Sequence, residues 1–220
     1  MISSNCQESR SIVVSNPRSG FHWLRYCLEF FSGRPTPGKP LIHDNGEMII
    51  SRTHDVRGNT CKGSPDCWRP LLDSKGFPLF KKMVLLLRDF RECCLDESNT
   101  EIDLLEVYAG NLRAYDKFSG EKILIYYENM VKNFSEVSRV LDFLGISHNP
   151  GEFDLEFHRR KSIMVYHRRR FSYTRNDLFN FHFHSDKASP EAVANIESRI
   201  TSLLEKELRE KYLSCYLKEV

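Results

Sequence analysis

The chain has 220 residues, of which 40% are hydrophobic, 12% aromatic and 28% charged, and this composition is typical of a folded globular protein rather than a disordered, fibrous or membrane chain. Its 32 basic and 30 acidic residues give a formal net charge of +2, so no global field would attract nucleic acid or an acidic membrane. Any anion site must be local. A chain of this length can bury its own core, so we expect a single domain over residues 1–220.

The seven cysteines are an odd number and are scattered along the chain, which shows no secretory signal. These features predict reduced thiols and a cytoplasmic protein without a membrane anchor. Cys61 and Cys67 share a short loop and could form a disulfide or help to bind a metal. No second cysteine pair has metal-ligand spacing, so we expect no metal site.

Short apolar runs bounded by polar or turn residues predict buried strands. In chain order these runs span Ser11–Ser15, Glu47–Ser51, Lys82–Leu87 and Lys122–Tyr126. Because their hydrophobic residues do not alternate strictly with polar ones, the strands are expected to be buried on both faces, as in a parallel sheet.

Segments with helical periodicity lie between and after these strands. They span Phe21–Phe31, Ile102–Phe118, a helix from Val137 that ends at Gly145, and a last helix that begins after Ser189 with Pro190 in its first turn. The alternation predicts an α/β fold in which helices flank a central parallel β-sheet. The strand, turn and helix at its start predict a P-loop-like phosphate-binding loop after the first strand.

The turn after the first strand carries the most informative residues. It runs from Asn16 to Gly20 and leads directly into a helix, and such a turn points backbone amides and a helix N-terminus at one spot, which suits a phosphate. Arg18 adds a fixed positive charge, and Gly20 lets the backbone approach closely. The alternative is an ordinary turn with a surface arginine.

This turn resembles the 5′-phosphosulfate loop of PAPS-dependent sulfotransferases, in which a Pro-Lys/Arg-Ser-Gly-Thr-Thr-Trp run holds the sulfate donor. Two residues depart from that pattern, because Phe21 and His22 stand where the family has threonines. Backbone amides, and His22, would then replace the lost hydroxyl contacts. The resemblance implies a donor-binding segment that consists of Pro17, Arg18, Ser19, Gly20, Phe21, His22 and Trp23.

Arg52, Thr53 and His54 follow the second predicted strand and are similar to the family's Lys-Thr-His, whose histidine acts as a general base on the acceptor. Histidine has an ordinary pKa of about 6.5 and can accept a proton at neutral pH. The alternative is a structural or surface histidine.

Arg88 and the residues after it resemble the family's 3′-phosphate signature, Arg-Asn/Asp-Pro-Arg/Lys-Asp/Glu, which assigns the 3′-phosphate contact to Arg88. The family's serine falls at Asp96, which would repel a phosphate, so Ser98 is a possible replacement. The alternative is that Arg88 belongs to a solvated helix start.

Two further segments complete the resemblance. Tyr127 stands in a segment similar to the family's Tyr-Glu-Asp-Met run and would lie near the adenine. Residues 158–188 would close on the donor through a basic run in place of the family's glycines, and residues 57–78 would form a lid or an acceptor-site loop. The basic run consists of Arg168, Arg169 and Arg170.

The resemblance implies a sulfotransferase that moves the sulfuryl group of PAPS to a hydroxyl or amine and releases PAP, with no metal. His54 would be the base, while Arg18 and Arg52 would stabilise the transferring group. The acceptor could be a small molecule, a saccharide or a peptide, and the sequence does not indicate the oligomeric state. Two alternatives remain: a P-loop kinase, which the missing Gly-x-x-x-x-Gly-Lys-Ser/Thr disfavours, and a catalytically silent nucleotide-binding protein.

Overall fold

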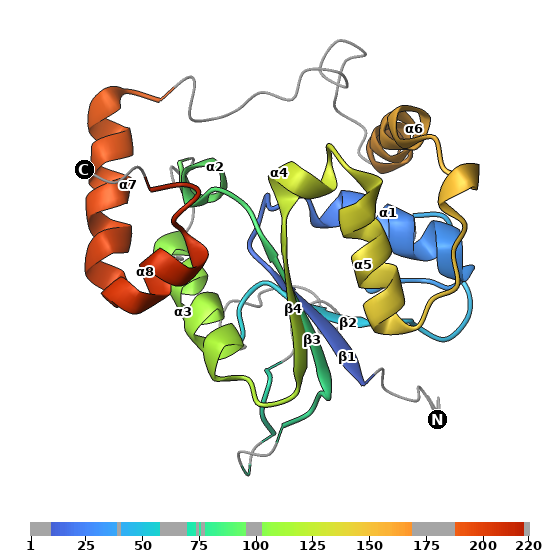
Figure 1. Cartoon of the computed structure of the whole chain (residues 1–220), viewed down its shortest axis with the longest axis horizontal. Coiled ribbons are helices and arrows are strands. Elements are labelled where there is room, and N and C mark those ends of the chain that lie inside the picture. Colours follow the sequence, from blue (N-terminus) through green and yellow to red (C-terminus); the bar gives the residue numbers. More distant parts are fainter. Residues whose placement is uncertain are drawn as a thin grey trace.

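The computed structural model describes residues 10–38, 41–57, 70–73, 75, 78–95, 103–168 and 188–217. Its centre is a sheet of parallel strands in the order β2-β1-β3-β4 (Figure 1). The strands are β1 (Ser11–Ser15), β2 (Ser51–Thr53), β3 (Lys82–Leu87) and β4 (Glu121–Tyr126). Each pair of neighbouring strands is parallel, so the predicted parallel sheet is confirmed.

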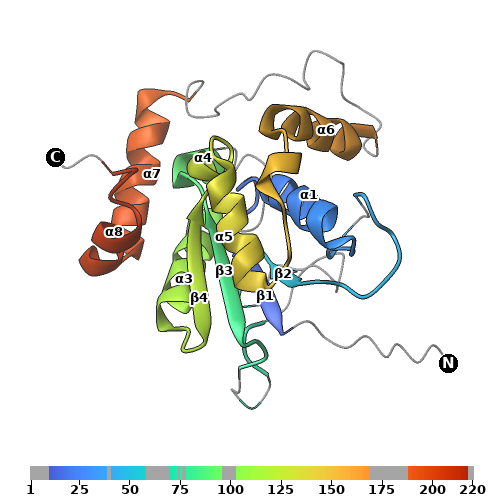
Figure 2. The ribbon, with the colours of Figure 1, turned by 45° about the vertical axis from the view of Figure 1, so that its right-hand side comes forward.

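Helices cover both faces of this sheet (Figure 2). On one face, Ile12, Val14 and Met83 pack in a core with residues of α2, α3, α7 and α8, and on the other face Val13, Val84 and Ile125 pack with residues of α1, α4 and α5. The helices are α1 (Phe21–Ser32), α2 (Phe90–Cys94), α3 (Leu104–Lys117), α4 (Tyr127–Met130), α5 (Phe134–Leu144), α6 (Leu155–Arg168), α7 (Pro190–Leu203) and α8 (Lys206–Tyr212).

The alternation of neighbouring residues between two cores explains the unbroken apolar runs of the central strands. Successive side chains point to opposite faces of a sheet, and here both faces are buried, so every position from Ile12 to Val14 and from Met83 to Leu87 is apolar and fully buried. The α/β fold class with helices on both sides is therefore confirmed.

Several helices begin or end at residues that commonly cap helices. Ser189 caps α7 by accepting a hydrogen bond from the Ala192 amide at 3.2 Å, and Gly145 ends α5 in the left-handed conformation that favours glycine. Asp103 caps α3 by accepting from two amides of its first turn. The last of these caps was missed, as were helices α6 and α8.

The second strand lies further along the chain than predicted. Its pairing with β1 begins where Ile12 faces Ser51 and ends where Val14 faces Thr53. The residues before it are held by the loop after α1 instead, because Arg34 donates to the carbonyls of Glu47 and Met48 and the Ile49 amide donates to Pro35. The prediction of a strand over Glu47–Ser51 was wrong because the residues before Ile50 bond to the loop after α1, and pairing with β1 begins only at Ser51.

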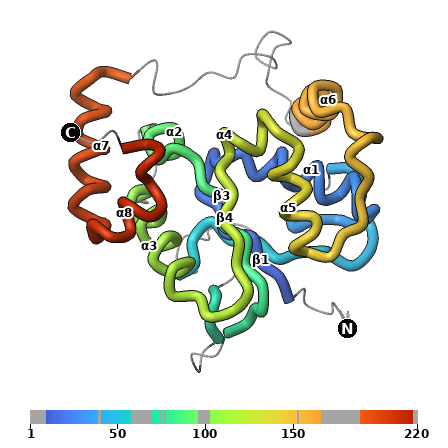
Figure 3. The backbone as a smooth tube through the Cα atoms, viewed as in Figure 1, coloured from blue at the N-terminus to red at the C-terminus, as the bar shows by residue number. Residues whose placement is uncertain are grey.

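The chain after α7 turns back and runs beside α3, as the tube in Figure 3 shows. The α8 helix packs against α3, where Tyr212 contacts Tyr115 edge to face at 5.8 Å.

Four cysteines in the described residues are free thiols: Cys27, Cys93, Cys94 and Cys215. Within the same residues no helix has the length and apolarity needed to cross a membrane.

Candidate active site

The candidate site lies at the carboxyl ends of β1, β2 and β3. From β1 the chain passes to β2 on one side of β1, and it then crosses to β3 on the other side of β1. In open parallel sheets, ligands bind in the crevice at such a reversal of strand order. The predicted residues Arg18, His54 and Arg88 all follow the ends of these strands.

The loop from Asn16 to Gly20 is shaped for anion binding. Arg18 and Gly20 both have positive φ, 64° and 83°, and the Ser19 amide donates to the Asn16 carbonyl at 3.2 Å. Left-handed residues in a turn of this kind direct neighbouring amides toward one point. Gly20 is also the N-cap of α1 and supplies no side-chain cap, so the loop presents the positive end of the helix dipole.

Gly20 has a second reason to be glycine. A Cβ added at this position would lie 2.1 Å from Cε2 of Tyr127, so the Tyr127 ring packs directly on the loop backbone. Tyr127 opens α4 after β4 and is buried, with 7% exposure. The predicted adenine-side residue and the predicted phosphate loop are therefore in contact.

Arg88 joins the two predicted cationic turns. Its Nη1 donates to the Arg18 carbonyl at 2.7 Å, and its Nη2 donates to Glu92 at 3.4 Å. The guanidinium carbon also lies 4.5 Å from the centre of the Tyr127 ring. Arg88 thus ties the end of β3 to the loop after β1, across the reversal of strand order.

His54 is held beside the same loop. Its Nδ1 lies 2.8 Å from the Ser15 carbonyl and 3.1 Å from Ser15 Oγ. Since a carbonyl can only accept, Nδ1 carries the proton and the ring's lone pair is on Nε2. Burial lowers the pKa of His54 to about 4; the bond to Ser15 opposes this change and the charge of Arg52 adds to it.

Phe21 contacts both this imidazole and Arg52. Its ring meets His54 edge to face at 6.1 Å between centroids, and the Arg52 guanidinium lies 5.4 Å from its centre. Phe21 is buried, with 4% exposure. The residue that replaces a threonine of the family pattern therefore packs against both the candidate base and a cation.

Comparisons with protein-family models and with curated proteins each found no match. Among solved structures, the chain is similar to the mouse sulfotransferase SULT7A1 complexed with PAP, with a TM-score of 0.50 and 17% sequence identity over 96% of this chain and 91% of that one. The chain therefore shares the α/β fold of that protein. The similarity concerns the fold, and it confirms the fold that the motifs predicted.

Within this fold, the other predicted residues have different environments. His22 is exposed and Pro17 is partly buried. Trp23 is buried, with its ring stacked on Tyr26 at 5.9 Å and tilted against Phe153 at 6.0 Å, so the structure places it in the core of the α1 face. Arg168 is the last residue of α6. Asp96, Ser98, Arg169 and Arg170 lie outside the described residues, as do Cys61 and Cys67.

Three buried donors around the loop lack an acceptor among the described residues: Asn16 Nδ2, Ser19 Oγ and Arg88 Nε. Buried polar groups are nearly always hydrogen-bonded, so unsatisfied donors gathered around one loop fit a site whose ligand is an anion. Asn16 was missed as a candidate residue, although its place immediately before Pro17 was a signal. No group of three or more His, Cys, Asp or Glu side chains in the part of the chain described here could hold a metal.

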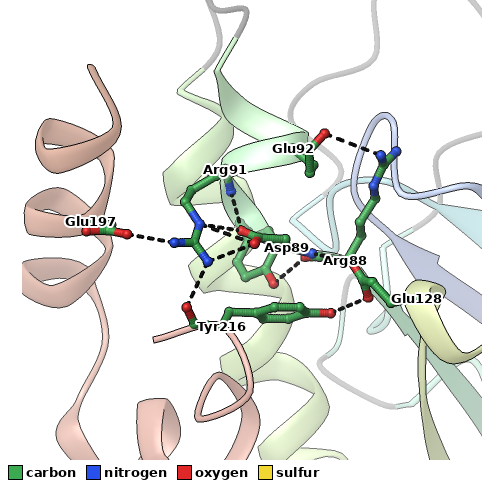
Figure 4. A network of polar contacts seen from close by, with 8 residues as sticks. Arg88, Asp89, Arg91, Glu92, Glu128, Glu197 and Tyr216 are labelled. Atoms are coloured by element: carbon green, nitrogen blue, oxygen red, sulfur yellow. Dashed lines mark hydrogen bonds and ion pairs between the residues drawn. The ribbon is translucent and has the colours of Figure 1, made fainter. Parts of the chain in front are cut away.

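A pocket of about 410 Å³ lies next to Arg88, and its lining is acidic. Its lining includes the carboxylates of Asp89, Glu92 and Glu128 together with Tyr126 and Tyr216. Figure 4 shows these acids in a network in which Arg91 bonds Asp89 and Tyr216 bonds Glu128. None of the predicted donor-binding residues lines this pocket, and its acidic wall is unsuited to a phosphate.

Proposed function

We propose that the protein is a PAPS-dependent sulfotransferase that transfers a sulfuryl group to a hydroxyl or amine. One observation carries the proposal: Arg88 reaches the Arg18 carbonyl at 2.7 Å while His54 is fixed on Ser15 at 2.8 Å. A cationic pair of turns and an imidazole thus lie together at the carboxyl ends of three parallel strands. Sulfuryl transfer needs this combination, because its charged donor must be held while the acceptor loses a proton.

In this proposal, the loop from Pro17 to Gly20 holds the 5′ end of the donor through backbone amides and the Arg18 charge. Arg88 holds the 3′ phosphate, and Tyr127 lies near the adenine. The buried donors of Asn16, Ser19 and Arg88 that lack an acceptor in the described residues support this assignment. PAPS supplies the sulfuryl group and leaves as PAP.

His54 is the proposed general base. Its Nδ1 is bonded to Ser15, so Nε2 accepts the proton of the acceptor's hydroxyl or amine. With a pKa of about 4, the imidazole is neutral over the whole physiological pH range and its Nε2 keeps its lone pair, although this pKa makes it a weaker base than an ordinary histidine. Arg18 and Arg52 stabilise the charge that develops on the transferring group.

The remaining assignments concern the acceptor and the segments around it. We propose a cytoplasmic enzyme of one domain over residues 1–220, with a small molecule, a saccharide or a peptide as acceptor. Residues 57–78 act as a lid or acceptor-site loop. Residues 158–188 close on the donor, and they begin within helix α6.

A catalytically silent nucleotide-binding protein is the second candidate, and one contact favours it. Phe21 packs edge to face on the His54 ring at 6.1 Å, in a place where the family has a small polar residue. A bulky ring next to the base would restrict the approach of an acceptor without affecting the phosphate loop.

Calorimetry with PAP and with ATP tests the donor. We expect PAP to bind and ATP to bind much more weakly, because ATP has no 3′ phosphate for Arg88. An Arg88→Met variant should lose this preference. Equal binding of PAP and ATP by the unaltered protein would favour a kinase and contradict the proposal.

Transfer of radioactive sulfate from PAPS to a panel of alcohols, amines, saccharides and peptides tests the chemistry. We expect His54→Ala to keep its affinity for PAP and to lose about 10²- to 10⁴-fold in rate, the usual contribution of a general base. His148→Ala is the matched control, since that histidine contacts Ser138 on α5. Binding of PAP without transfer to any acceptor would favour the silent protein.

A further inference from the structure

A single amide side chain links the phosphate loop to the segment that carries His54. Asn111 lies on α3 and is fully buried, with 0% exposure. Its buried neighbours on that helix are mostly apolar, including Tyr108, Ala109 and Leu112. A buried amide is costly unless its polar atoms are hydrogen-bonded, so its contacts indicate why it is there.

Both hydrogens of the Asn111 amide donate hydrogen bonds, and the two acceptors lie beyond the ends of different strands. Nδ2 donates to Asn16 Oδ1 at 2.9 Å and to the His54 carbonyl at 2.9 Å. Oδ1 accepts from the Val56 amide at 3.2 Å. One side chain therefore bonds the loop after β1 and the segment after β2 at three points.

These contacts begin where the sheet ends. The last paired residues of β1 and β2 are Val14 and Thr53, and Asn16 and His54 lie just beyond them. Beyond these residues the Asn111 amide, in place of backbone pairing, connects the two segments. It holds the two segments at the separation that lets His54 Nδ1 reach the Ser15 carbonyl at 2.8 Å.

We propose that Asn111 is a positioning residue that holds the His54 imidazole against the phosphate loop. The catalytic part of this inference rests on the proposed sulfotransferase function. The geometric part does not, because it concerns only where the ring lies. Asn111 acts through the two segments it joins and has no contact with the His54 ring among those described.

The test uses Asn111→Leu, which keeps a similar volume and removes all three hydrogen bonds, and Asn111→Ala, which leaves room for water if leucine prevents folding. Leu112→Ala is the matched control, because Leu112 is equally buried on the same helix and bonds neither segment. The first readout is the pKa of His54 by NMR, with its signals assigned from their loss in His54→Gln.

We expect the pKa of His54 to rise from about 4 toward 6.5 in both Asn111 variants, because the ring is released into water, and to stay low in Leu112→Ala. The charged group that acts on the ring, Arg52, is unchanged, and the nearby carboxylate of Asp55 remains paired with Arg57 at 3.0 Å. With PAPS, kcat should fall about 10²-fold, the effect of a misplaced catalytic group, while KM for PAPS changes little.

The outcomes separate this inference from the function it builds on. An unchanged His54 pKa and kcat in the Asn111 variants would overturn the positioning role while leaving the sulfotransferase proposal intact. Equal changes in Leu112→Ala would also overturn it, since the role would then be structural only. If the unaltered protein transfers no sulfate, the proposed function fails, and the NMR titration still decides whether Asn111 sets the place of the ring.

Discussion

At the scale of single residues, two glycines with the same backbone conformation have different constraints. Gly20 and Gly33 both have positive φ, 83° and 64°. A Cβ on Gly20 would collide with Tyr127 at 2.1 Å, whereas a Cβ on Gly33 would meet nothing within 4 Å. Gly33 is therefore constrained by backbone strain alone, and Gly20 by strain and by the packed ring.

We predict that Gly20→Ala destabilises the protein by more than about 2 kcal/mol, since steric overlap adds to the cost of about 1 kcal/mol for a left-handed alanine. Gly33→Ala should cost only that smaller amount. Urea denaturation measures both, and calorimetry with PAP should show loss of binding for Gly20→Ala alone. Equal effects of the two substitutions would contradict the role of Tyr127.

The depressed pKa of His54 predicts a pH dependence of stability. Between about 4, its pKa in the folded protein, and about 6.5, its ordinary value, the unfolded chain binds the proton and the folded protein does not. The free energy of unfolding should therefore rise with pH across this window, by on the order of 3 kcal/mol in total.

The stability that depends on neutral His54 is fully present above pH 6.5 and is lost below about pH 4. Urea denaturation at a series of pH values measures it, and His54→Gln, which cannot titrate, should lose that part of the slope. An unaltered slope in the variant would show that His54 is not buried in its neutral form.

At the scale of elements, a buried ion pair shapes the loop after α1. Glu29 is fully buried and lies 3.5 Å from Arg25, which is also buried. Its carboxylate also accepts from the amides of Thr36, Ile42 and His43. One side chain of α1 thus holds two parts of the chain after that helix, one at Thr36 and the other at Ile42 and His43.

We predict that Glu29→Gln destabilises the protein by about 3 kcal/mol, because it removes the carboxylate that lies 3.5 Å from the buried Arg25 and turns an amide hydrogen toward backbone donors. Glu210→Gln is the control, since its pair with Lys206 is exposed and such pairs contribute little. Denaturant midpoints compare the two. A similar small change in both would contradict the structural role of the buried pair.

At the scale of the whole molecule, Arg91 connects parts of the chain that are far apart in sequence (Figure 4). It bonds Asp89 at 2.8 Å, Glu197 of α7 at 2.7 Å and the Tyr216 carbonyl at 2.7 Å. The C-terminal segment is bonded again where the Tyr216 hydroxyl donates to Glu128 at 2.6 Å. This network fastens α7 and the residues after α8 beside the turn that carries Arg88.

We predict that Arg91→Met speeds amide hydrogen exchange in α7 and in residues 213–217 while leaving β1 and β3 protected, because the lost bonds to charged groups hold only the outer segments. Arg139→Met is the control, since its pair with Glu136 is exposed on the arginine side. Faster exchange throughout the sheet would show that the network supports the whole core.

Local signals in the sequence were sufficient for the elements that depend on their own residues. The bounds of β1 and β3 and the cap of α7 were predicted as they are found, because a buried run or a capping serine acts within a few residues. The turn between β1 and α1 was predicted for the same reason, since Arg18 and Gly20 are adjacent to the strand and helix that shape it.

Tertiary structure decided what depends on partners distant in sequence. The place of β2 follows from where β1 begins to pair, and the pKa of His54 follows from burial beside Ser15. The contact of Gly20 with Tyr127 and the bonds of Asn111 to two strand ends have no sequence signal at all. The sequence by itself therefore determined the types of residue at the site and the fold class, whereas packing alone decided which of them meet, because hydrogen bonds and desolvation act between neighbours in space.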